Sequence, residues 1–262
     1  MHIISLLDII IKWLSAIYDE EVLHDSIFIY IIIIFSIPIL LIEWVVGKHN
    51  PDLKNKTTQA MVKWAFRGCS VLAGVSLDVI GMENIPQEGA VLYVGNHSSY
   101  FDIVLTYLCF PRPTGYVAKV EMEKLPLLSV WMKNIHCLFL NRDNIKEGMK
   151  AIMKGIEELK SGISICIFPE GTRNTNPDMI LPFREGSFRM AEKAKCPIIP
   201  ICINNSSAVW EAHLPTMKKA HVIIEFGKPI HLDGLSREER KFLGAHTRKT
   251  IQEMYDRNKK LI

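Results

Sequence analysis

The sequence predicts an α/β fold in which helices flank a mixed, largely parallel sheet, preceded by an N-terminal membrane-associated helical segment. Three observations support this prediction. Short apolar segments alternate with segments of helical periodicity through most of the 262 residues. Several of the short segments are apolar throughout, which is typical of parallel strands that are covered on both faces. The positive mean hydropathy comes mainly from one apolar run near the N-terminus.

The apolar run is SIFIYIIIIFSIPILLIEWVV, residues 26–46, and Glu43 is its one ionisable side chain. About 20 apolar residues are enough to cross the hydrocarbon layer of a bilayer. Pro38 predicts a kink or a re-entrant shape within the run. Residues 3–18 are also largely apolar and predict a second membrane-associated helix. The alternative is that both segments are buried helices of a soluble protein, although a domain of this size rarely needs so apolar a run.

The charges on either side of the run predict its orientation. Acidic residues precede it and basic residues follow it. The positive-inside rule therefore predicts a membrane protein in which the chain after residue 47 lies on the cytoplasmic face. We expect two parts, with membrane-associated helices and a basic connector in residues 1–66 and an α/β domain in residues 67–262.

Charge and cysteine content exclude several classes of protein. The net charge of +3 does not imply a nucleic-acid partner. The six cysteines are scattered, without a CxxC pair or a Cys/His cluster. Neither a zinc site nor a disulfide framework is therefore indicated, and we expect no metal and no cofactor.

Polar residues that directly follow strands are the candidates for a site, because ligands of open α/β sheets bind beyond the carboxyl ends of the strands. The clearest helix begins at residue 145 and is closed by Gly162. The predicted strands are residues 75–81, 90–95, 115–119, 136–142, 163–168, 197–203 and 221–227.

The first candidate is NHSSYFD, which follows the strand at residues 90–95. If the chain turns into a helix here, His97 lies in the turn and Asp102 in the first helical turn, where the two side chains can meet. The carboxylate would then fix the imidazole tautomer and leave the second ring nitrogen as a proton acceptor. The alternative is that Asn96 or Ser98 caps the helix and that His97 is merely exposed.

Motifs for other kinds of catalysis are absent from the sequence. It contains no GxSxG, HExxH or Walker-type motif, so neither a serine nucleophile nor metal assistance is indicated. A histidine–carboxylate pair without its own nucleophile fits a base that activates a hydroxyl group on a substrate.

The second candidate is FPEGTRN, which also directly follows a predicted strand. Gly171 lets the backbone approach a ligand closely, and Thr172 and Arg173 supply donors suited to phosphate. Glu170 is a candidate to hydrogen-bond a substrate hydroxyl or to brace an arginine. The alternative is a salt-bridged turn with no ligand.

Two further basic residues, Lys119 and Arg142, lie at the ends of two other predicted strands. If these strands are parallel to the ones before NHSSYFD and FPEGTRN, all four elements converge on one edge of the sheet.

Together these segments resemble the glycerolipid acyltransferases. NHSSYFD is similar to their NHxxxxD motif, and FPEGTR matches their third motif residue for residue. The stretch from Lys119 to Arg142 resembles the second motif, and CPIIPICI resembles the fourth. The apolar N-terminus resembles the membrane-docking helices of the 1-acylglycerol-3-phosphate (lysophosphatidic acid) acyltransferase branch. Ser129 and His136 stand where the second motif often carries glycine.

The resemblance implies acyl transfer from acyl-CoA or acyl-acyl carrier protein, as co-substrate, to the free hydroxyl of 1-acylglycerol-3-phosphate at a membrane. The product would be phosphatidic acid. By the same resemblance, His97 is the general base, Asp102 orients it, and backbone amides at the helix start stabilise the oxyanion. Arg173 is the first choice to bind the phosphate of the acceptor, with Lys119 and Arg142 behind it.

Three alternatives remain open from the sequence. The acceptor is another lysophospholipid or glycerol-3-phosphate, the histidine–aspartate pair serves a hydrolase, or the chain is a non-catalytic membrane lipid-binding protein.

Overall fold

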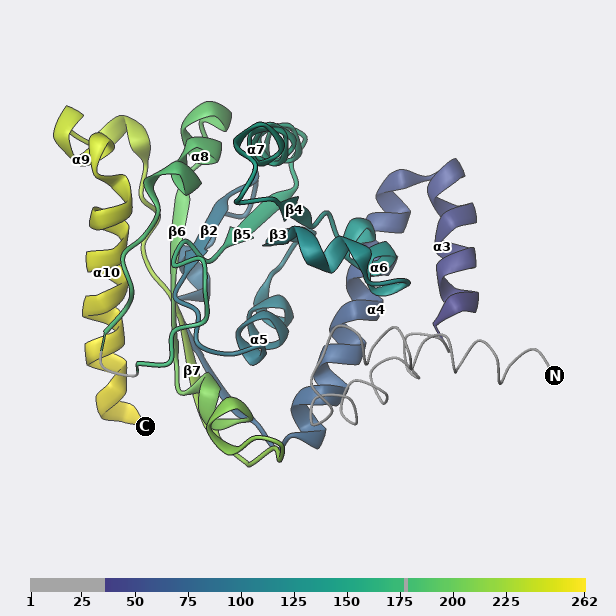
Figure 1. Cartoon of the computed structure of the whole chain (residues 1–262), viewed down its shortest axis with the longest axis horizontal. Helices are drawn as coiled ribbons and strands as arrows, with labels where there is room; N and C mark the ends of the chain where they lie inside the picture. The colour runs from purple at the N-terminus through teal and green to yellow at the C-terminus, as the bar shows by residue number, and fades with distance from the viewer. Residues whose placement is uncertain (1–35, 177–178) are drawn as a thin grey trace.

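The computed structural model describes residues 36–176 and 179–262 (Figure 1). The predicted helix at residues 3–18 and the first part of the apolar run, residues 26–35, lie outside the described residues.

A seven-stranded sheet, in the order β1-β7-β6-β2-β5-β3-β4, forms the centre of the molecule. Neighbouring strands are parallel at every pair except β6 and β7. The mixed, largely parallel α/β sheet is therefore confirmed. The strands are β1 (Ser76–Ile80), β2 (Leu92–Gly95), β3 (Thr114–Lys119), β4 (Leu138–Leu140), β5 (Ser164–Ile167), β6 (Ile198–Asn204) and β7 (His221–Phe226).

Helices cover both faces of the sheet, as the apolar strands predict. Strand β2 shows the division, since Tyr93 belongs to one buried cluster and Leu92 and Val94 belong to the other. Helices α4 (Pro51–Leu72) and α5 (Phe101–Cys109) lie on the Tyr93 side. Helices α7 (Ile145–Lys160), α8 (Arg189–Ala194) and α10 (Leu243–Asn258) lie on the opposite side (Figure 1).

The remaining helical segments are short. Two are α-helices, α6 (Leu128–Asn134) and α9 (Arg237–Lys241). The others are single 3₁₀ turns: η1 (Met82–Asn84), η2 (Val120–Lys124), η3 (Glu185–Phe188), η4 (Ser206–Ala208), η5 (Glu211–His213), η6 (Leu232–Gly234) and η7 (Lys259–Leu261).

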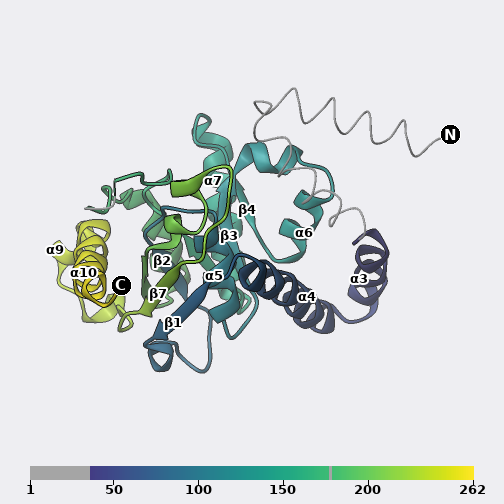
Figure 2. The same cartoon turned by 90° about the horizontal axis from the view of Figure 1, so that it is seen from below.

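A helical hairpin of α3 (Ile37–His49) and α4 projects from the sheet domain (Figure 2). Pro38 lies in the first turn of α3, where its missing N–H group is not needed. The expected basic connector is helical, because the side chain of Asn50 caps α4 by accepting a hydrogen bond from Leu53. The boundary expected between residues 66 and 67 thus falls inside α4. Among the described residues, none of the helices combines the length and apolar character needed to span a bilayer.

Helix α3 has the reverse of the usual burial pattern. Its single carboxylate, Glu43, is only 4% exposed and accepts hydrogen bonds from the hydroxyls of Thr57 and Thr58 on α4, at 3.0 and 3.2 Å. Leu41 and Trp44, by contrast, are 61% and 59% exposed. The hairpin therefore buries its polar contacts and presents apolar side chains outward.

His136 stands at a position where the second motif named above often carries glycine. Its backbone is left-handed, with φ +61°. Its ring is held by Glu158 of α7 at Nδ1 and by Asn55 of α4 at Nε2, each at 3.0 Å. The hydrogen bond from His136 is the main cause of a lowered pKa for the Glu158 carboxyl group. These contacts compensate the strained backbone at the turn into β4 and tie it to two helices.

Gly115 of β3 provides a test of the packing at this turn, because a Cβ atom there would lie 2.0 Å from the carbonyl oxygen of His136. We expect Gly115→Ala to destabilise the protein by about 1–3 kcal/mol, since the clash is with backbone. The melting temperature should fall by roughly 2–12 °C in a thermal unfolding measurement. Gly68→Ala on α4, where nothing lies within 4 Å of the new methyl group, is the control and should raise the melting temperature slightly. Equal stability of the two variants would contradict this reading of the turn.

The contact between Glu158 and His136 predicts a dependence of stability on pH. Because the pKa of Glu158 is lowered on folding from its ordinary value of 4.5, its contribution is fully present above that pH. The contribution is lost as the pH falls through the lowered pKa. We therefore expect Glu158→Gln to be less stable than wild type at pH 7 and the difference to shrink toward pH 3, measured by denaturant unfolding. The exposed neighbour Glu157→Gln should show no such convergence.

Candidate active site

Four neighbouring strands bring the sequence-predicted residues to one edge of the sheet. Strands β2, β5, β3 and β4 are adjacent and mutually parallel. Their carboxyl ends therefore lie side by side, and the predicted convergence is confirmed. At or directly after these ends lie His97, the segment 168–174, Lys119, which is the last residue of β3, and Arg142.

His97 and Asp102 meet as the sequence predicts. Helix α5 begins at Phe101, which puts Asp102 in its first turn, and His97 Nδ1 lies 2.8 Å from Asp102 Oδ2. Since an ionised carboxylate only accepts hydrogen bonds, Nδ1 carries the hydrogen and Nε2 is left with a lone pair. The His97 side chain is 16% exposed, so the imidazole remains accessible at the sheet edge.

The Asp102 carboxylate is completely buried and is surrounded by donors. Besides His97 Nδ1, the backbone N–H groups of Ser98 and Ser99 donate to Oδ2 at 2.7 and 2.8 Å. The Ser206 hydroxyl in η4 donates to Oδ1. These donors compensate the burial of the charge and fix the carboxylate against the imidazole.

Ser206 was not predicted from the sequence, although a signal for it exists. Strand β6 runs parallel to β2, so its carboxyl end reaches the same edge, and Ser206 follows that end by two residues. Polar residues that follow a strand are candidates for a site, and this rule, which selected His97, also applies to the segment after CPIIPICI.

The backbone amides at the start of α5 are not available as an oxyanion hole, which corrects the sequence expectation. Ser98 and Ser99 donate to Asp102, as described above. The N–H of Tyr100 donates to Glu211 Oε1 at 2.7 Å, and that of Phe101 donates to the Ser99 hydroxyl at 2.9 Å. The carboxylates of Asp102 and Glu211 and the hydroxyl of Ser99 already accept the hydrogens of these four N–H groups.

Two residues outside the pair hold the imidazole in place. The buried Asn96 side chain both donates to the carbonyl and accepts from the N–H of Ile203, at 2.8 Å each, which extends the pairing of β2 with β6. The ring of Phe168 stacks on the ring of His97 with centroids 4.4 Å apart. Gly95 permits this stack, because a Cβ atom there would lie 3.0 Å from the Phe168 ring.

Glu170 accepts hydrogen bonds from two backbone groups of the described residues, and its expected contact with a substrate hydroxyl stays a prediction. Its Oε1 accepts from the N–H of His97 at 2.7 Å, and its Oε2 accepts from the N–H of Leu181 at 3.0 Å. Burial raises the pKa of the Glu170 carboxyl group, and these two backbone hydrogen bonds oppose the rise. With the side chain 6% exposed and both oxygens engaged, Glu170 fastens the loop after β5 to the His97 turn. The N–H of Asn174 makes a second fastening by donating to the carbonyl of His97 at 2.7 Å.

Arg173 reaches the start of α5 and has a carboxylate partner there. Its Nη1 lies 3.3 Å from Glu211 Oε1, and its guanidinium lies over the Tyr100 ring, 3.9 Å from the centroid. Glu211 also accepts from the Ser99 hydroxyl at 2.6 Å. Glu211 is thus a second residue that sequence reasoning missed, and it comes from η5, far along the chain.

The remaining predicted residues are Lys119, Arg142, Gly171 and Thr172, of which Arg142 contacts Gly171. Lys119, Thr172 and Arg142 are exposed at the sheet edge. Gly171 has φ +78°, a conformation that favours glycine, and its carbonyl accepts a hydrogen bond from Arg142 Nη1. A third missed residue, Arg184, also approaches Gly171.

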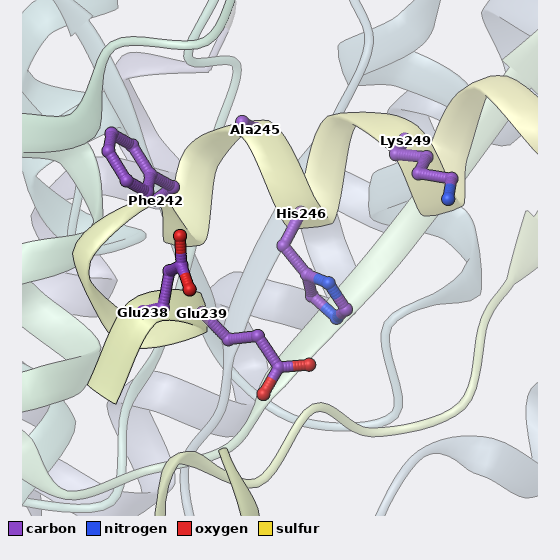
Figure 3. A pocket seen from close by; sticks show the side chains of 6 residues that line it. All are labelled: Glu238, Glu239, Phe242, Ala245, His246 and Lys249. Carbon is purple, nitrogen blue, oxygen red and sulfur yellow. The ribbon is translucent and has the colours of Figure 1, made fainter. Parts of the chain in front are cut away.

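Other kinds of site find no support in the described part of the chain. No group of three or more metal-binding side chains occurs there. Burial raises the pKa of Cys109 and Cys137 to about 12 and that of Cys196 to about 11, so these thiols stay protonated and are poor nucleophiles. A hollow of about 290 Å³ lies at the junction of α9 and α10 (Figure 3). It is lined by Glu238, Glu239, Phe242, Ala245, His246 and Lys249.

Comparison with known proteins agrees with this geometry. Residues 76–204, which contain His97, Asp102 and Arg173, match the family model described as Acyltransferase. The chain is 27% identical to the 1-acyl-sn-glycerol-3-phosphate acyltransferase of Saccharomyces cerevisiae over 210 residues, which are 78% of this chain and 68% of the yeast protein. It is 35% identical to the enzyme of that name from Borreliella burgdorferi over 136 residues, 52% of this chain and 54% of that protein.

A solved structure shares the fold. The crystal structure of the 1-acyl-sn-glycerophosphate (LPA) acyltransferase, PlsC, from Thermotoga maritima aligns with a TM-score of 0.69 and 22% identity, covering 86% of this chain and 97% of that one. Residues 76–204 are therefore similar to the acyltransferase family, and the relatives named above extend this similarity over a longer part of the chain.

Proposed function

We propose that the protein is a 1-acylglycerol-3-phosphate acyltransferase, which transfers a fatty acyl group from a thioester to the free hydroxyl of lysophosphatidic acid and forms phosphatidic acid. The observation that carries the proposal is the 2.8 Å contact between His97 and the buried Asp102, which leaves His97 Nε2 at the sheet edge. The relatives of S. cerevisiae and B. burgdorferi, named for this activity, support the choice of acceptor.

The reaction follows from the geometry of the pair. His97 Nε2 takes the proton of the acceptor hydroxyl as its oxygen attacks the thioester carbonyl carbon. The resulting imidazolium lies against the Asp102 carboxylate, which stabilises its charge. When the carbon–sulfur bond breaks, the imidazolium returns the proton to the thiolate, and an ester and a free thiol leave. The donor is acyl-CoA or acyl-acyl carrier protein, since both supply this thioester.

General-base assistance by His97 accounts for only part of the rate acceleration that an enzyme of this kind needs. General-base assistance contributes typically 10²–10⁴-fold to a rate. The rest must come from holding both substrates in line, which can contribute about 7–11 kcal/mol. The hydrogen bonds of Glu170 and Asn174 to His97 fix the loop after β5 relative to the base. Lys119, Arg142 and Arg173 place positive charge at the same edge, which suits an acceptor that carries a phosphate.

The exposed apolar face of α3 supports docking of the chain on a membrane. The acceptor and the product are lipids, and moving an acyl chain into water costs about 0.8 kcal/mol for each CH₂. Docking avoids this cost. Because Glu43 turns inward while Leu41 and Trp44 turn outward, the hairpin presents to its surroundings the surface that a lipid phase favours.

The histidine is tested by substitution. We expect His97→Ala to lose on the order of 10²–10⁴-fold in kcat with little change in melting temperature, because the residue lies beyond the end of β2. The measurement is mass-spectrometric detection of phosphatidic acid formed from acyl-CoA and 1-acylglycerol-3-phosphate by detergent-purified protein. His246→Ala, on the outer face of α10, is the control and should keep wild-type turnover.

Two results would contradict this assignment. Wild-type turnover by His97→Ala would show that His97 is not the general base. Release of free fatty acid in the absence of acceptor would identify a hydrolase in place of a transferase.

Membrane docking is tested with a fluorescent reporter. Cys69 is the exposed one of the six cysteines, so a Cys69→Ser background permits labelling of a cysteine introduced at Leu41. We expect the emission of a polarity-sensitive dye at Leu41→Cys to shift to the blue when phospholipid vesicles are added. A dye at Met217→Cys, an exposed position remote in sequence, should report no shift. Identical responses at the two positions would rule out docking through α3.

A further inference from the structure

Three rings form a column across the carboxyl ends of three neighbouring strands. Tyr116 comes from β3, Phe168 follows β5, and His97 follows β2. The rings of Tyr116 and Phe168 are stacked, with centroids 6.1 Å apart and planes inclined by 24°. The ring of Phe168 stacks in turn on His97, with centroids 4.4 Å apart and planes inclined by 12°. Tyr116 therefore supports the imidazole through one intermediate ring.

The hydroxyl of Tyr116 reaches the other member of the catalytic pair. Its oxygen lies 2.7 Å from the Thr106 hydroxyl and 3.2 Å from the carbonyl oxygen of Ile103. The Thr106 hydroxyl donates its one hydrogen to the carbonyl of Asp102, so it accepts from Tyr116. The carbonyls of Asp102 and Ile103 both belong to the first turn of α5. The hydroxyl therefore holds the turn from which the Asp102 side chain reaches His97.

Burial makes these contacts well defined. Tyr116 and Thr106 are both buried, so their hydrogen bonds lie in an environment of low dielectric constant. Burial also raises the pKa of the Tyr116 hydroxyl well above its ordinary value, so the group stays protonated and remains a donor. One side chain of β3 thus contacts both branches of the pair, the imidazole through its ring and the carboxylate helix through its hydroxyl.

A second buried tyrosine of the same cluster shows what a purely structural role looks like. Tyr93 of β2 makes its ring contacts with Phe110 and Phe226, on the side of the cluster away from the imidazole. Among the ring contacts of the described residues, none joins Tyr93 to Phe168 or to His97. Tyr93 is therefore a matched control for Tyr116.

We propose that Tyr116 is a positioning residue for acyl transfer, which holds His97 through Phe168 and holds Asp102 through Thr106. The proposal rests on the proposed function, because the rate that it affects is that of acyl transfer. Catalysis by a base depends on its alignment with the attacking hydroxyl, and a displacement of about 1 Å can cost on the order of 100-fold in rate. Tyr116 touches neither substrate in this scheme, and it acts only through the two members of the pair.

Two variants separate the hydroxyl from the ring. Tyr116→Phe keeps the ring and removes the hydroxyl, and we expect kcat to fall roughly 2–10-fold. Tyr116→Leu removes both contacts, and we expect kcat to fall on the order of 10–100-fold. KM for the acceptor and for acyl-CoA should change much less than kcat in both variants, because substrate binding is left in place. Tyr93→Phe should keep the kcat of the wild type.

The kinetic result is decisive even if Tyr116→Leu folds poorly, since Tyr116→Phe conserves the shape of the ring. A kcat equal to that of Tyr93→Phe in either variant of Tyr116 would overturn the proposal. A rise in KM at constant kcat would also overturn it, because that result would describe a residue that binds substrate.

A spectroscopic measurement separates this proposal from the proposed function, because it needs no turnover. The hydrogen on His97 Nδ1, 2.8 Å from Asp102, should give a downfield proton NMR signal that is identified by its loss in His97→Ala. We expect the signal to stay sharp in Tyr93→Phe and to broaden in Tyr116→Phe and Tyr116→Leu, because a less firmly held imidazole exchanges this hydrogen with water faster.

The two proposals then fail in different ways. If the signal responds to Tyr116 but the wild type transfers no acyl group, the proposed function fails and the positioning role stands. If the wild type transfers acyl groups but neither kcat nor the signal distinguishes the Tyr116 variants from Tyr93→Phe, Tyr116 is a core residue only and the positioning role fails.

Discussion

The buried carboxylate of Asp102 is the interaction on which the rest of the site depends. Its oxygens accept from the imidazole, from two backbone amides of the turn and from the Ser206 hydroxyl. A charge with no exposed surface is tolerable in a protein only when donors surround it in this way. Two of these donors belong to the turn between β2 and α5, so the carboxylate that binds His97 also holds the path of the chain there. Loss of any of these donors would leave a buried charge less compensated as well as change the position of His97.

The loop after β5 is positioned by a second set of hydrogen bonds to the same turn. Glu170 accepts from the N–H of His97, and Asn174 donates to its carbonyl, so both backbone groups of the histidine are held by one loop. Phe168 of that loop stacks on the imidazole. The histidine therefore has few degrees of freedom beyond its contact with substrate, which agrees with a mechanism in which positioning supplies much of the rate. The same hydrogen bond gives the acidic residue before Gly171 a positioning role.

The N-terminal hairpin and the sheet domain show opposite burial. In the sheet domain, apolar side chains form buried clusters on both faces of the sheet. In α3, the carboxylate of Glu43 is buried against two threonines, and apolar side chains are exposed. Exposed apolar side chains that lie together on one element are typical of an interaction surface. The connection through α4, whose Lys63 and Gln59 side chains donate to the last turn of α5 at Phe110, links this surface directly to the helix that carries Asp102.

The sequence by itself determined the class of fold, the strands and the edge at which the site lies. Apolar segments of strand length separated by helical periodicity were sufficient for the parallel sheet, and parallel strands must end at a common edge. Sequence alone therefore predicted that His97, Gly171, Lys119 and Arg142 lie at one edge of the sheet. The pairing of His97 with Asp102 followed from local geometry. Two residues that are five positions apart can meet when the first lies in a turn and the second lies in the first turn of the following helix.

Only the tertiary structure decided which groups are free to act. The amides of Ser99 and Tyr100 looked available from the sequence, but Asp102 and the distant Glu211 accept their hydrogens. Arg173, predicted to bind the phosphate, is paired with the distant Glu211, and Arg184 reaches Gly171 from another segment. These outcomes depend on side chains separated by tens of residues in the chain. The periodicity of a sequence specifies which face of an element is buried, but which polar groups meet across that face is fixed only when the elements pack.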